Sequence, residues 1–251
     1  MRALLRWVGL VLVAAAALQL FFLGRVALTA TMNPQSTTFE RSEAWRITRE
    51  KGRLQWRQQW MPYDAISDNL KRAVIASEDG SFTNHEGVDW EALEKAWQRN
   101  AKAEEQAARQ RPRPAAAAQA APRAAPRAPK IVGGSTITQQ LAKNLLLSGD
   151  RTLLRKGQEI VLTFALEKML SKQRILEIYL NSVEWGEGVF GAEAAARHYF
   201  RKPASQLTPY EAARLAVMLP RPKYFEKLPN SGYLASRAST IVARMRDAEL
   251  P

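Results

Sequence analysis

The sequence predicts a mainly α-helical domain behind one N-terminal transmembrane helix, and three observations lead to this fold class. An almost unbroken apolar run, Trp7–Leu23, stands near the N-terminus. Further along, apolar residues recur at helical spacing, as in Ile66, Leu70 and Val74. Alternating strand patterns are nearly absent from the rest of the chain.

The apolar run predicts a membrane anchor. A helix of this run would be about 26 Å long, close to the thickness of the hydrocarbon layer, and Gln19 is its only polar residue. Arg2 and Arg6 precede it, which by the positive-inside tendency keeps the N-terminus in the cytoplasm. We therefore expect residues 1–25 to form a cytoplasmic tip and a single transmembrane anchor.

Two other interpretations of the run are open. A cleavable signal peptide would need a cleavage site with small residues, and Leu28-Thr29-Ala30 is a poor substitute for Ala-x-Ala. A buried core helix is disfavoured because the run is terminal, has basic flanks and lacks an amphipathic stripe. The retained anchor is the preferred prediction.

Residues 26–61 read as a polar juxtamembrane connector that carries aromatic side chains. These are Phe39, Trp45, Trp56 and Trp60. Aromatic rings of this kind rest at the lipid interface in many membrane proteins. Ordinary packing of the same rings against the domain is an equally good interpretation.

Helix caps divide the remainder into segments. The candidate caps are Asp89 for a helix running through Trp97, Ser135 for 136–147, Ser171 for 172–181, and Thr208 with Pro209 and Glu211 as a capping box. A last apolar series at helical spacing comprises Leu234, Ala238, Ile241 and Met245. These signals predict helices through to the end of the domain.

Charge and composition restrict the function. The chain has 37 Lys and Arg against 24 Asp and Glu, a net charge of +13, which calls for an anionic partner such as nucleic acid, a phosphate-bearing substrate or a membrane surface. It has no cysteine, so disulfide scaffolds, zinc ribbons, iron–sulfur clusters and thiol catalysis are excluded. Only His85 and His198 are available, which almost excludes a histidine-based metal site.

Residues 101–130 form an insertion rich in Ala, Pro and basic residues. Its first part can extend the preceding helix, but the repeated prolines after Arg111 are incompatible with a continued helix or a sheet. We expect a basic, mobile linker within the domain.

The densest polar cluster is the segment 77–89, which follows an apolar helix. It contains four acids and His85 in a turn punctuated by glycine. A helix that ends at Glu78 partly desolvates this carboxylate and raises its pKa, which makes Glu78 a competent general base or acid. The alternative is a solvated acidic loop without catalytic function.

Two further clusters carry polar groups. The glycine-rich segment 133–144 leads into a helix, whose free N–H groups and dipole favour an anion, and Gln140 and Lys143 add donors. It is not a Walker A loop, because the Gly-Lys-Ser/Thr ending is missing. In the segment 151–159, Arg155 and Glu159 are an i,i+4 pair, for which a surface salt bridge is the plain interpretation.

Taken together, the motifs resemble those of the peptidoglycan glycosyltransferases over roughly residues 62–226. In chain order they are Glu78-Asp79-x-x-Phe82-x-x-His85-x-Gly87-x-Asp89, Gly133-Gly134-Ser135-Thr136-Ile137-Thr138-Gln139-Gln140, Arg155-Lys156-x-x-Glu159, Arg174-Ile175-Leu176-x-x-Tyr179-Leu180-Asn181, Gly188-Val189-Phe190-Gly191-x-x-x-Ala195, Tyr199-Phe200 and Glu211-Ala212-Ala213-x-Leu215-Ala216. The resemblance implies a lysozyme-like helical glycosyltransferase domain over residues 62–251. The monofunctional biosynthetic branch is most similar, because no Ser-x-x-Lys transpeptidase nucleophile occurs and few residues follow Pro229.

The resemblance also implies the chemistry and the site. Glu78 matches the general base that takes the proton from the 4-hydroxyl of lipid II, which attacks C1 of the growing glycan with inversion and releases undecaprenyl pyrophosphate. Glu159 matches a second essential glutamate, and Lys143 and Arg151 match pyrophosphate ligands. The other implied substrate-binding residues are Asp79, Phe82, His85, Ser135, Thr136, Gln139, Gln140, Asn144, Arg155 and Lys156. A divalent cation, Mg²⁺ or Mn²⁺, would be held mainly by the substrate pyrophosphate.

The implied partners are lipid II, the growing glycan chain, the lipid bilayer and other cell-wall synthesis and division proteins, with no nucleic acid. The implied location is the bacterial inner membrane, with the catalytic domain on the periplasmic side. The sequence departs from the family pattern in the 101–130 insertion and at Gln158, where some relatives have Lys.

Two rival functions are weighed against this one. A membrane-anchored lysozyme-like lytic enzyme shares the helical fold and a catalytic glutamate, but it has no need for a cluster of cations near the site. A basic membrane-tethered binding module explains the net charge but not the ordered setting of Glu78, Gln140 and Glu159.

Overall fold

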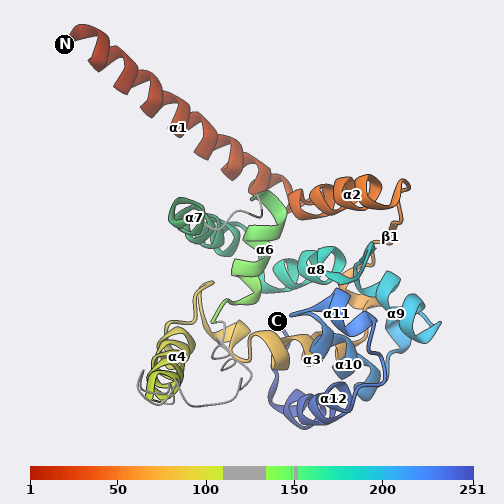
Figure 1. The fold of residues 1–251 in the computed structure, drawn as a ribbon. Coiled ribbons are helices and arrows are strands. Elements are labelled where there is room, and N and C mark those ends of the chain that lie inside the picture. Colours follow the sequence, from red (N-terminus) through yellow and green to blue (C-terminus); the bar gives the residue numbers. More distant parts are fainter. Residues whose placement is uncertain (110–133, 148, 150–151) are drawn as a thin grey trace, which may run out of the picture. The chain divides into compact units, whose positions relative to one another are not determined.

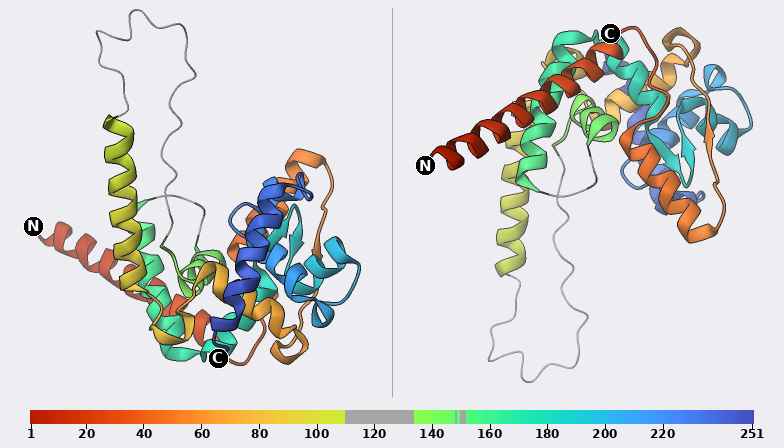
Figure 2. Two further views of the ribbon diagram at one scale, coloured as in Figure 1. Left: turned by 90° about the horizontal axis from the view of Figure 1, so that it is seen from below. Right: turned by 90° about the horizontal axis from the view of Figure 1, so that it is seen from above.

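The computed structural model describes residues 1–109, 134–147, 149 and 152–251, and it divides into two units. The first unit comprises Met1–Val88 and Thr136–Pro251, and the second comprises Asp89–Ser135. The described elements are mainly helices, as predicted (Figures 1 and 2). Arg151 and the insertion beyond residue 109 lie outside the described residues.

The predicted N-terminal helix is present as α1 (Arg2–Leu28), which is longer than the apolar run. Its most apolar window has a mean hydropathy of 2.2, and none of that window is buried, so a core helix is the wrong interpretation. Helix α1 extends away from the rest of the first unit, and its C-terminal part contacts α7 (Figure 1). Its length and composition are sufficient to cross a membrane.

The connector contains a helix that the sequence analysis did not predict, α2 (Thr38–Lys51). Thr37 and Glu40 form a capping box at its N-terminus, and Gly52 ends it with a φ of +68°. Only Glu40 and Ile47 are buried along this helix. Because α2 therefore lacks an apolar stripe, hydrophobic periodicity could not reveal it.

The connector aromatics mostly pack against the domain. Trp56 stacks on Phe190 with ring centroids 4.5 Å apart, and Phe39 meets the same ring edge-on at 6.3 Å. Trp60 is half-buried and packs on the core. Trp45 is 72% exposed. The packing interpretation therefore holds for three of the four rings.

The main helical core is built from α3 (Asp68–Glu78), α10 (Pro209–Met218) and α12 (Gly232–Arg244). Helix α10 packs against both of the others. The two predicted apolar series are buried here, namely Ile66, Leu70 and Val74, and Leu234, Ala238, Ile241 and Met245. The predicted Thr208 capping box is confirmed, with Pro209 at the first helical turn.

A second part of the first unit surrounds a small sheet with the order β1-β3-β2. Its strands are β1 (Arg57–Gln58), β2 (Glu184–Gly186) and β3 (Val189–Phe190), with β1 parallel and β2 antiparallel to β3. The helices around it are α8 (Lys172–Ser182), α9 (Ala192–Phe200) and α11 (Pro222–Glu226). Ser171 caps α8, as predicted. Short 3₁₀ turns occur at Tyr63–Ala65, Phe82–Asn84, Ala204–Gln206 and Met245–Asp247.

Two remaining helices of the first unit complete the frame of the site, α6 (Ile137–Leu146) and α7 (Leu153–Met169). They pack against each other, and α6 also contacts α2 and α8.

The second unit is described as helix α4 (Trp90–Arg109) and the residues beside it. The Asp89 carboxylate accepts a hydrogen bond from the Ala92 N–H at 2.7 Å, which confirms the predicted cap. The helix continues past Trp97, so the first residues of the insertion do extend it.

Candidate active site

Glu78 is the last residue of α3, and the packing of that helix fixes its position. Leu70 and Val74 on the apolar face of α3 are buried, which holds the helix against the core. Glu78 at its C-terminal end is therefore half-buried. Burial raises the pKa of Glu78, while a hydrogen bond from the Gln140 amide opposes the shift and the neighbouring Asp79 charge adds to it. A carboxylate of this kind holds a proton more readily than an exposed one, which suits a general base.

Gln140 is fixed in one orientation by two partners. Its Nε2 donates to Glu78 Oε2 at 3.0 Å, and its Oε1 accepts from the Tyr179 hydroxyl at 3.0 Å. Burial raises the pKa of Tyr179 well above its usual value, so the hydroxyl remains a donor. Because a donor occupies Oε1, the NH₂ side of the amide must face Glu78.

Tyr179 was not among the predicted site residues. It lies within the Arg174–Asn181 motif, and that motif was the only sequence signal for it. Its contact with Gln140 joins α8 to α6, which are distant in sequence.

Asp79 and His85 form an internal brace beside Glu78. Asp79 Oδ1 lies 2.8 Å from His85 Nε2, and Asp79 Oδ2 accepts from the Ile137 N–H at 2.9 Å. His85 Nδ1 accepts a hydrogen bond from the Gly87 N–H at 3.1 Å, so the ring hydrogen is on Nε2. Nε2 therefore donates a hydrogen bond to Asp79 Oδ1. Phe82 beneath them is fully buried. These three predicted substrate-binding side chains support the site from inside the protein.

The N-terminus of α6 differs from the prediction in two ways. Thr136 rather than Ser135 is the cap, because Thr136 and Gln139 form a reciprocal capping box and Thr136 Oγ1 also donates to the Gly87 carbonyl at 2.6 Å. The N–H groups expected to receive a ligand anion are also occupied. Asp79 accepts from Ile137, and Thr136 accepts from Gln139. The anion at this helix N-terminus is therefore the protein's own carboxylate.

Gly87 allows the Glu78 loop to lie directly on α7. Its φ is +89°, and a Cβ at this position would come within 2.6 Å of Thr163 Cγ2 and 2.9 Å of Glu167 Cγ. Thr163 in turn donates to the carbonyl of Glu159, one turn earlier on the helix. The loop that carries one glutamate thus packs against the helix that carries the other.

Lys172 and Glu167 hold this loop from the side, and the sequence analysis missed both. Lys172 Nζ lies 2.8 Å from Glu167 Oε1 and donates to the His85 carbonyl at 2.6 Å. Thr138 also donates to Glu167 Oε1, at 2.6 Å.

Glu159 is a buried carboxylate held by two cations. Its side chain is 3% exposed, and it lies 2.7 Å from Arg155 Nη1 and 2.5 Å from Lys156 Nζ. The plain interpretation of a surface salt bridge is therefore wrong. Such a carboxylate fixes two cationic groups at the start of α7, where Lys156 remains partly exposed.

Two of the remaining predicted residues lie on α6. Lys143 is exposed near the C-terminal end of α6, and Asn144 follows it, half-buried. Ser135 belongs to the second unit. Among the described residues, no three His, Asp or Glu side chains converge on a point where they could hold a metal ion.

The transmembrane candidate is joined to the same helix as Glu159. Gln19 Nε2 donates to Gln158 Oε1 at 2.7 Å, and Gln158 Nε2 donates back to Gln19 Oε1 at 3.0 Å. The single polar residue of the apolar run therefore pairs with the residue that departs from the family pattern.

Comparison with known proteins identifies the family. The Transglycosylase family model matches residues 46–109 and 113–246, so the chain belongs to this family. A protein of Burkholderia orbicola named biosynthetic peptidoglycan transglycosylase is 50% identical over 235 residues, covering 94% of this chain and 86% of the relative. Proteins of the same name from Paraburkholderia phytofirmans and Burkholderia thailandensis are each 48% identical, over 98% and 100% of this chain and 94% and 90% of their own lengths.

Proposed function

We propose that this transglycosylase polymerises lipid II into β-1,4-linked glycan strands of peptidoglycan. Membership of the family and the shared name of its relatives support peptidoglycan glycosyltransferase activity. The observation that carries the mechanism is the partly buried Glu78 carboxylate, with its raised pKa and its orientation by Gln140.

In the proposed step, Glu78 removes the proton from the 4-hydroxyl of the acceptor lipid II. The acceptor oxygen forms a bond to C1 of the growing glycan, and the bond from C1 to the pyrophosphate oxygen breaks with inversion. Undecaprenyl pyrophosphate leaves with the bonding electrons, and the proton remains on Glu78. Base assistance of this kind is worth roughly 10²–10⁴ in rate.

The negative charge of the leaving pyrophosphate needs to be stabilised by cationic side chains. Arg155 and Lys156, held by Glu159, and Lys143 on α6 supply the positive charge in this proposal, together with Arg151. Both oxygens of Glu159 are engaged by cationic side chains, so the described residues do not fit a metal site built by the protein itself. We therefore assign no step to a divalent cation.

We also propose that α1 is retained as a single-pass anchor in the inner membrane, with the catalytic domain on the periplasmic side. The length and apolar composition of α1 support an anchor, and the basic residues before it support this orientation. The Gln19–Gln158 pair supports retention over cleavage, because removal of α1 would leave Gln158 without this partner.

The test is Glu78→Gln in a polymerisation assay with purified lipid II. The substitution keeps the size of the side chain and removes its basicity, so activity should fall by roughly 10²–10⁴ while the circular dichroism spectrum is unchanged. The matched control is Glu86→Gln in the same loop, because the Glu86 side chain is 83% exposed. If Glu78→Gln retains more than about a tenth of the wild-type rate, Glu78 is not the base.

The same preparation separates the rival functions. Incubation with intact sacculi should release no soluble fragments, whereas a lytic enzyme would release them. Failure of the wild type to form polymer from lipid II would instead favour a binding module.

A further inference from the structure

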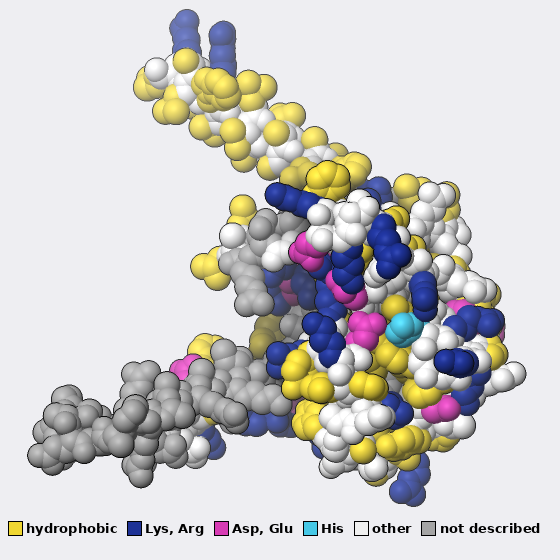
Figure 3. Space-filling view, turned by 45° about the vertical axis from the view of Figure 1, so that its right-hand side comes forward, with side chains coloured by type: hydrophobic (Ala, Val, Ile, Leu, Met, Phe, Trp, Pro, Cys, Tyr) yellow, Lys and Arg dark blue, Asp and Glu magenta, His cyan; other side chains and the backbone are white. Residues whose placement is uncertain are grey.

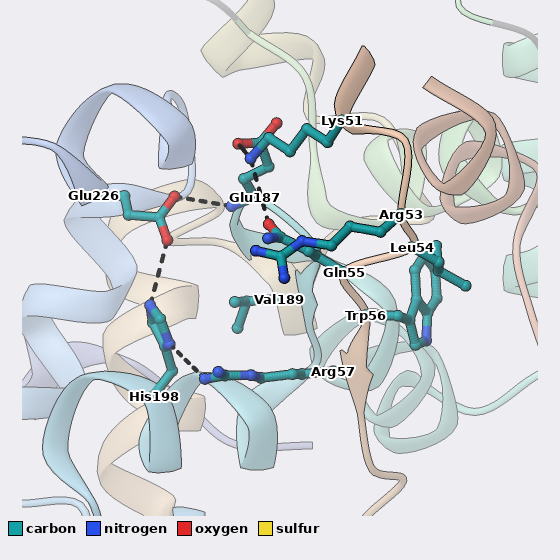
Figure 4. A pocket seen from close by; sticks show the side chains of 11 residues that line it. Lys51, Arg53, Leu54, Gln55, Trp56, Arg57, Glu187, Val189, His198 and Glu226 are labelled. Atoms are coloured by element: carbon teal, nitrogen blue, oxygen red, sulfur yellow. Dashed lines mark hydrogen bonds and ion pairs between the residues drawn. The ribbon is translucent and has the colours of Figure 1, made fainter. Parts of the chain in front are cut away.

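A pocket of about 520 Å³ lies on the first unit, away from the residues used in the proposed chemistry (Figure 4). It is lined by Lys51, Arg53, Leu54, Gln55, Trp56, Arg57, Glu187, Gly188, Val189, His198 and Glu226. Its size is within the range of small-ligand sites, which is roughly 300–1,000 Å³. None of the predicted site residues lines it, so the proposed reaction leaves it unexplained.

The segment leading into β1 shapes this pocket. The side chains of Arg53, Gln55 and Arg57 lie on the same side of this segment, and those of Leu54 and Trp56 lie on the other (Figure 4). The chain is held against the residues before β3 by the Arg57 N–H, which donates to the Gly188 carbonyl at 2.8 Å. Gly188 has a φ of +73°, and a Cβ there would lie only 2.1 Å from the Gln55 carbonyl oxygen. The close approach depends on this glycine and sets the position of both arginines.

The two acidic side chains of the pocket already have partners. Glu187 lies 2.5 Å from Lys51 Nζ and 3.2 Å from an Arg46 nitrogen. Glu226 accepts from the Glu187 N–H at 2.9 Å and lies 3.3 Å from His198 Nε2. Both carboxylates are therefore held in place on one side of the pocket (Figure 4).

The two arginines differ, because neither forms an ion pair with a carboxylate within the parts of the chain that the structure describes. Arg57 Nη1 lies 2.9 Å from His198 Nδ1, so its contact within the pocket is an imidazole and not a carboxylate. Both guanidinium groups point into the pocket (Figure 4). Lys and Arg side chains are also frequent on the face shown in Figure 3.

These charges define the chemistry of a ligand. The lining residues Lys51, Arg53 and Arg57 outnumber the two carboxylates, and Arg53 and Arg57 are not paired with either of them, so the pocket favours an anionic ligand group. Guanidinium groups match the planar geometry of a carboxylate. On the opposite side, Glu187 and Glu226 can accept from N–H donors of the ligand. A carboxylate next to N–H groups is the chemistry of a peptide end.

We infer that this pocket binds the carboxylate end of a short peptide, held by Arg53 and Arg57. The inference rests on the proposed function for the source of that peptide, because a peptidoglycan precursor and its polymer both carry peptides beside the glycan. The pocket would then hold the peptide part of the substrate or product while polymerisation occurs elsewhere.

Calorimetric titration of the full-length protein in detergent tests this inference. The probe is a synthetic stem pentapeptide with free carboxylates, and the comparison ligands are the same peptide with every carboxylate amidated and inorganic phosphate. The free peptide should bind, and Arg53→Gln or Arg57→Gln should weaken binding by about tenfold or more, because each removes a charge-assisted contact. Arg49→Gln removes the same charge from an exposed site outside the pocket and should have no effect.

Arg57→Lys controls for damage to β1, because lysine keeps the positive charge but lacks the planar guanidinium group that can form two parallel hydrogen bonds to a carboxylate. It should bind the peptide more tightly than Arg57→Gln and less tightly than the wild type, with an unchanged melting temperature. Equal binding of the amidated peptide, or displacement of the peptide by equimolar phosphate, would overturn the inference.

Polymerisation assays keep this inference separate from the proposed function. An active wild type that fails to bind the peptide refutes the pocket inference alone. A wild type that binds the peptide but forms no polymer refutes the function alone.

Discussion

Replacement of Gln140 by Met should shift the pH dependence of the enzyme. The substitution keeps an unbranched side chain of similar length and removes the amide that donates to Glu78 at 3.0 Å. This hydrogen bond favours the ionised carboxylate, so its loss raises the pKa of Glu78 beyond the rise that burial already causes.

The size of the shift follows from the energy of the lost contact. A hydrogen bond to a charged group is worth about 1.5–3 kcal/mol, which at about 1.36 kcal/mol per unit corresponds to roughly one to two pKa units. Glu78 must be ionised to accept a proton. A higher pKa therefore moves the acidic limb of the rate profile to higher pH, and the variant loses most activity on the acidic side.

The assay is the initial rate of lipid II polymerisation across roughly pH 5–9 at saturating substrate. Ser77→Ala is the matched control, because the Ser77 hydroxyl lies 3.4 Å from Glu78, at the limit of hydrogen bonding. It should move the acidic limb much less. Tyr179→Phe, which frees the Gln140 amide to rotate, should give an intermediate shift. An acidic limb that is identical in wild type and folded Gln140→Met would refute this reasoning.

Three further outcomes are expected. Gly87→Ala should lower the melting temperature, because a positive φ costs a residue with a side chain about 1–2 kcal/mol and the new Cβ would collide with α7. Gly80→Ala is the control, because Gly80 has open space around it, and its melting temperature should not fall. Equal melting temperatures for the two variants would contradict this prediction. Gln19→Leu should lower stability in detergent by about 1 kcal/mol, and the added Gln158→Leu should recover part of the loss, since no amide is then left unpaired. Burial raises the pKa of Glu184 to about 7, so ionisation opposes folding as pH rises towards that value; Glu184→Gln should therefore stabilise the protein at about pH 8 but not at about pH 4, and equal gains at both pH values would show that charge is not the cause.

Local patterns were sufficient for α1, α3 and α12 and for three of the four predicted caps. The apolar run of α1, the buried series along α3 and α12, and the caps at Asp89, Ser171 and Thr208 depend on residues within a few positions of one another. Short-range periodicity and capping chemistry reveal such elements without knowledge of the rest of the chain. Glu78 as the end of a buried helix was accessible for the same reason.

Where two neighbouring residues could equally well cap a helix, contacts with residues distant in the sequence decided which of them does so. Ser135 and Thr136 are adjacent and can both cap a helix, but only Thr136 also bonds to the Gly87 carbonyl. Helix α2 lacks an apolar stripe, so its place depends on packing against α6 and not on its own pattern.

The chemistry of the site was decided by tertiary structure. The sequence alone predicted Glu78, Gln140 and Glu159 as site residues, but it did not show that Tyr179 fixes the Gln140 amide. It also did not show that Asp79 already neutralises the N-terminus of α6. These bonds join residues between 39 and 58 positions apart, and side-chain hydrogen bonds over such separations have no local periodicity. Only the packing of the helices brings donor and acceptor within 3.0 Å.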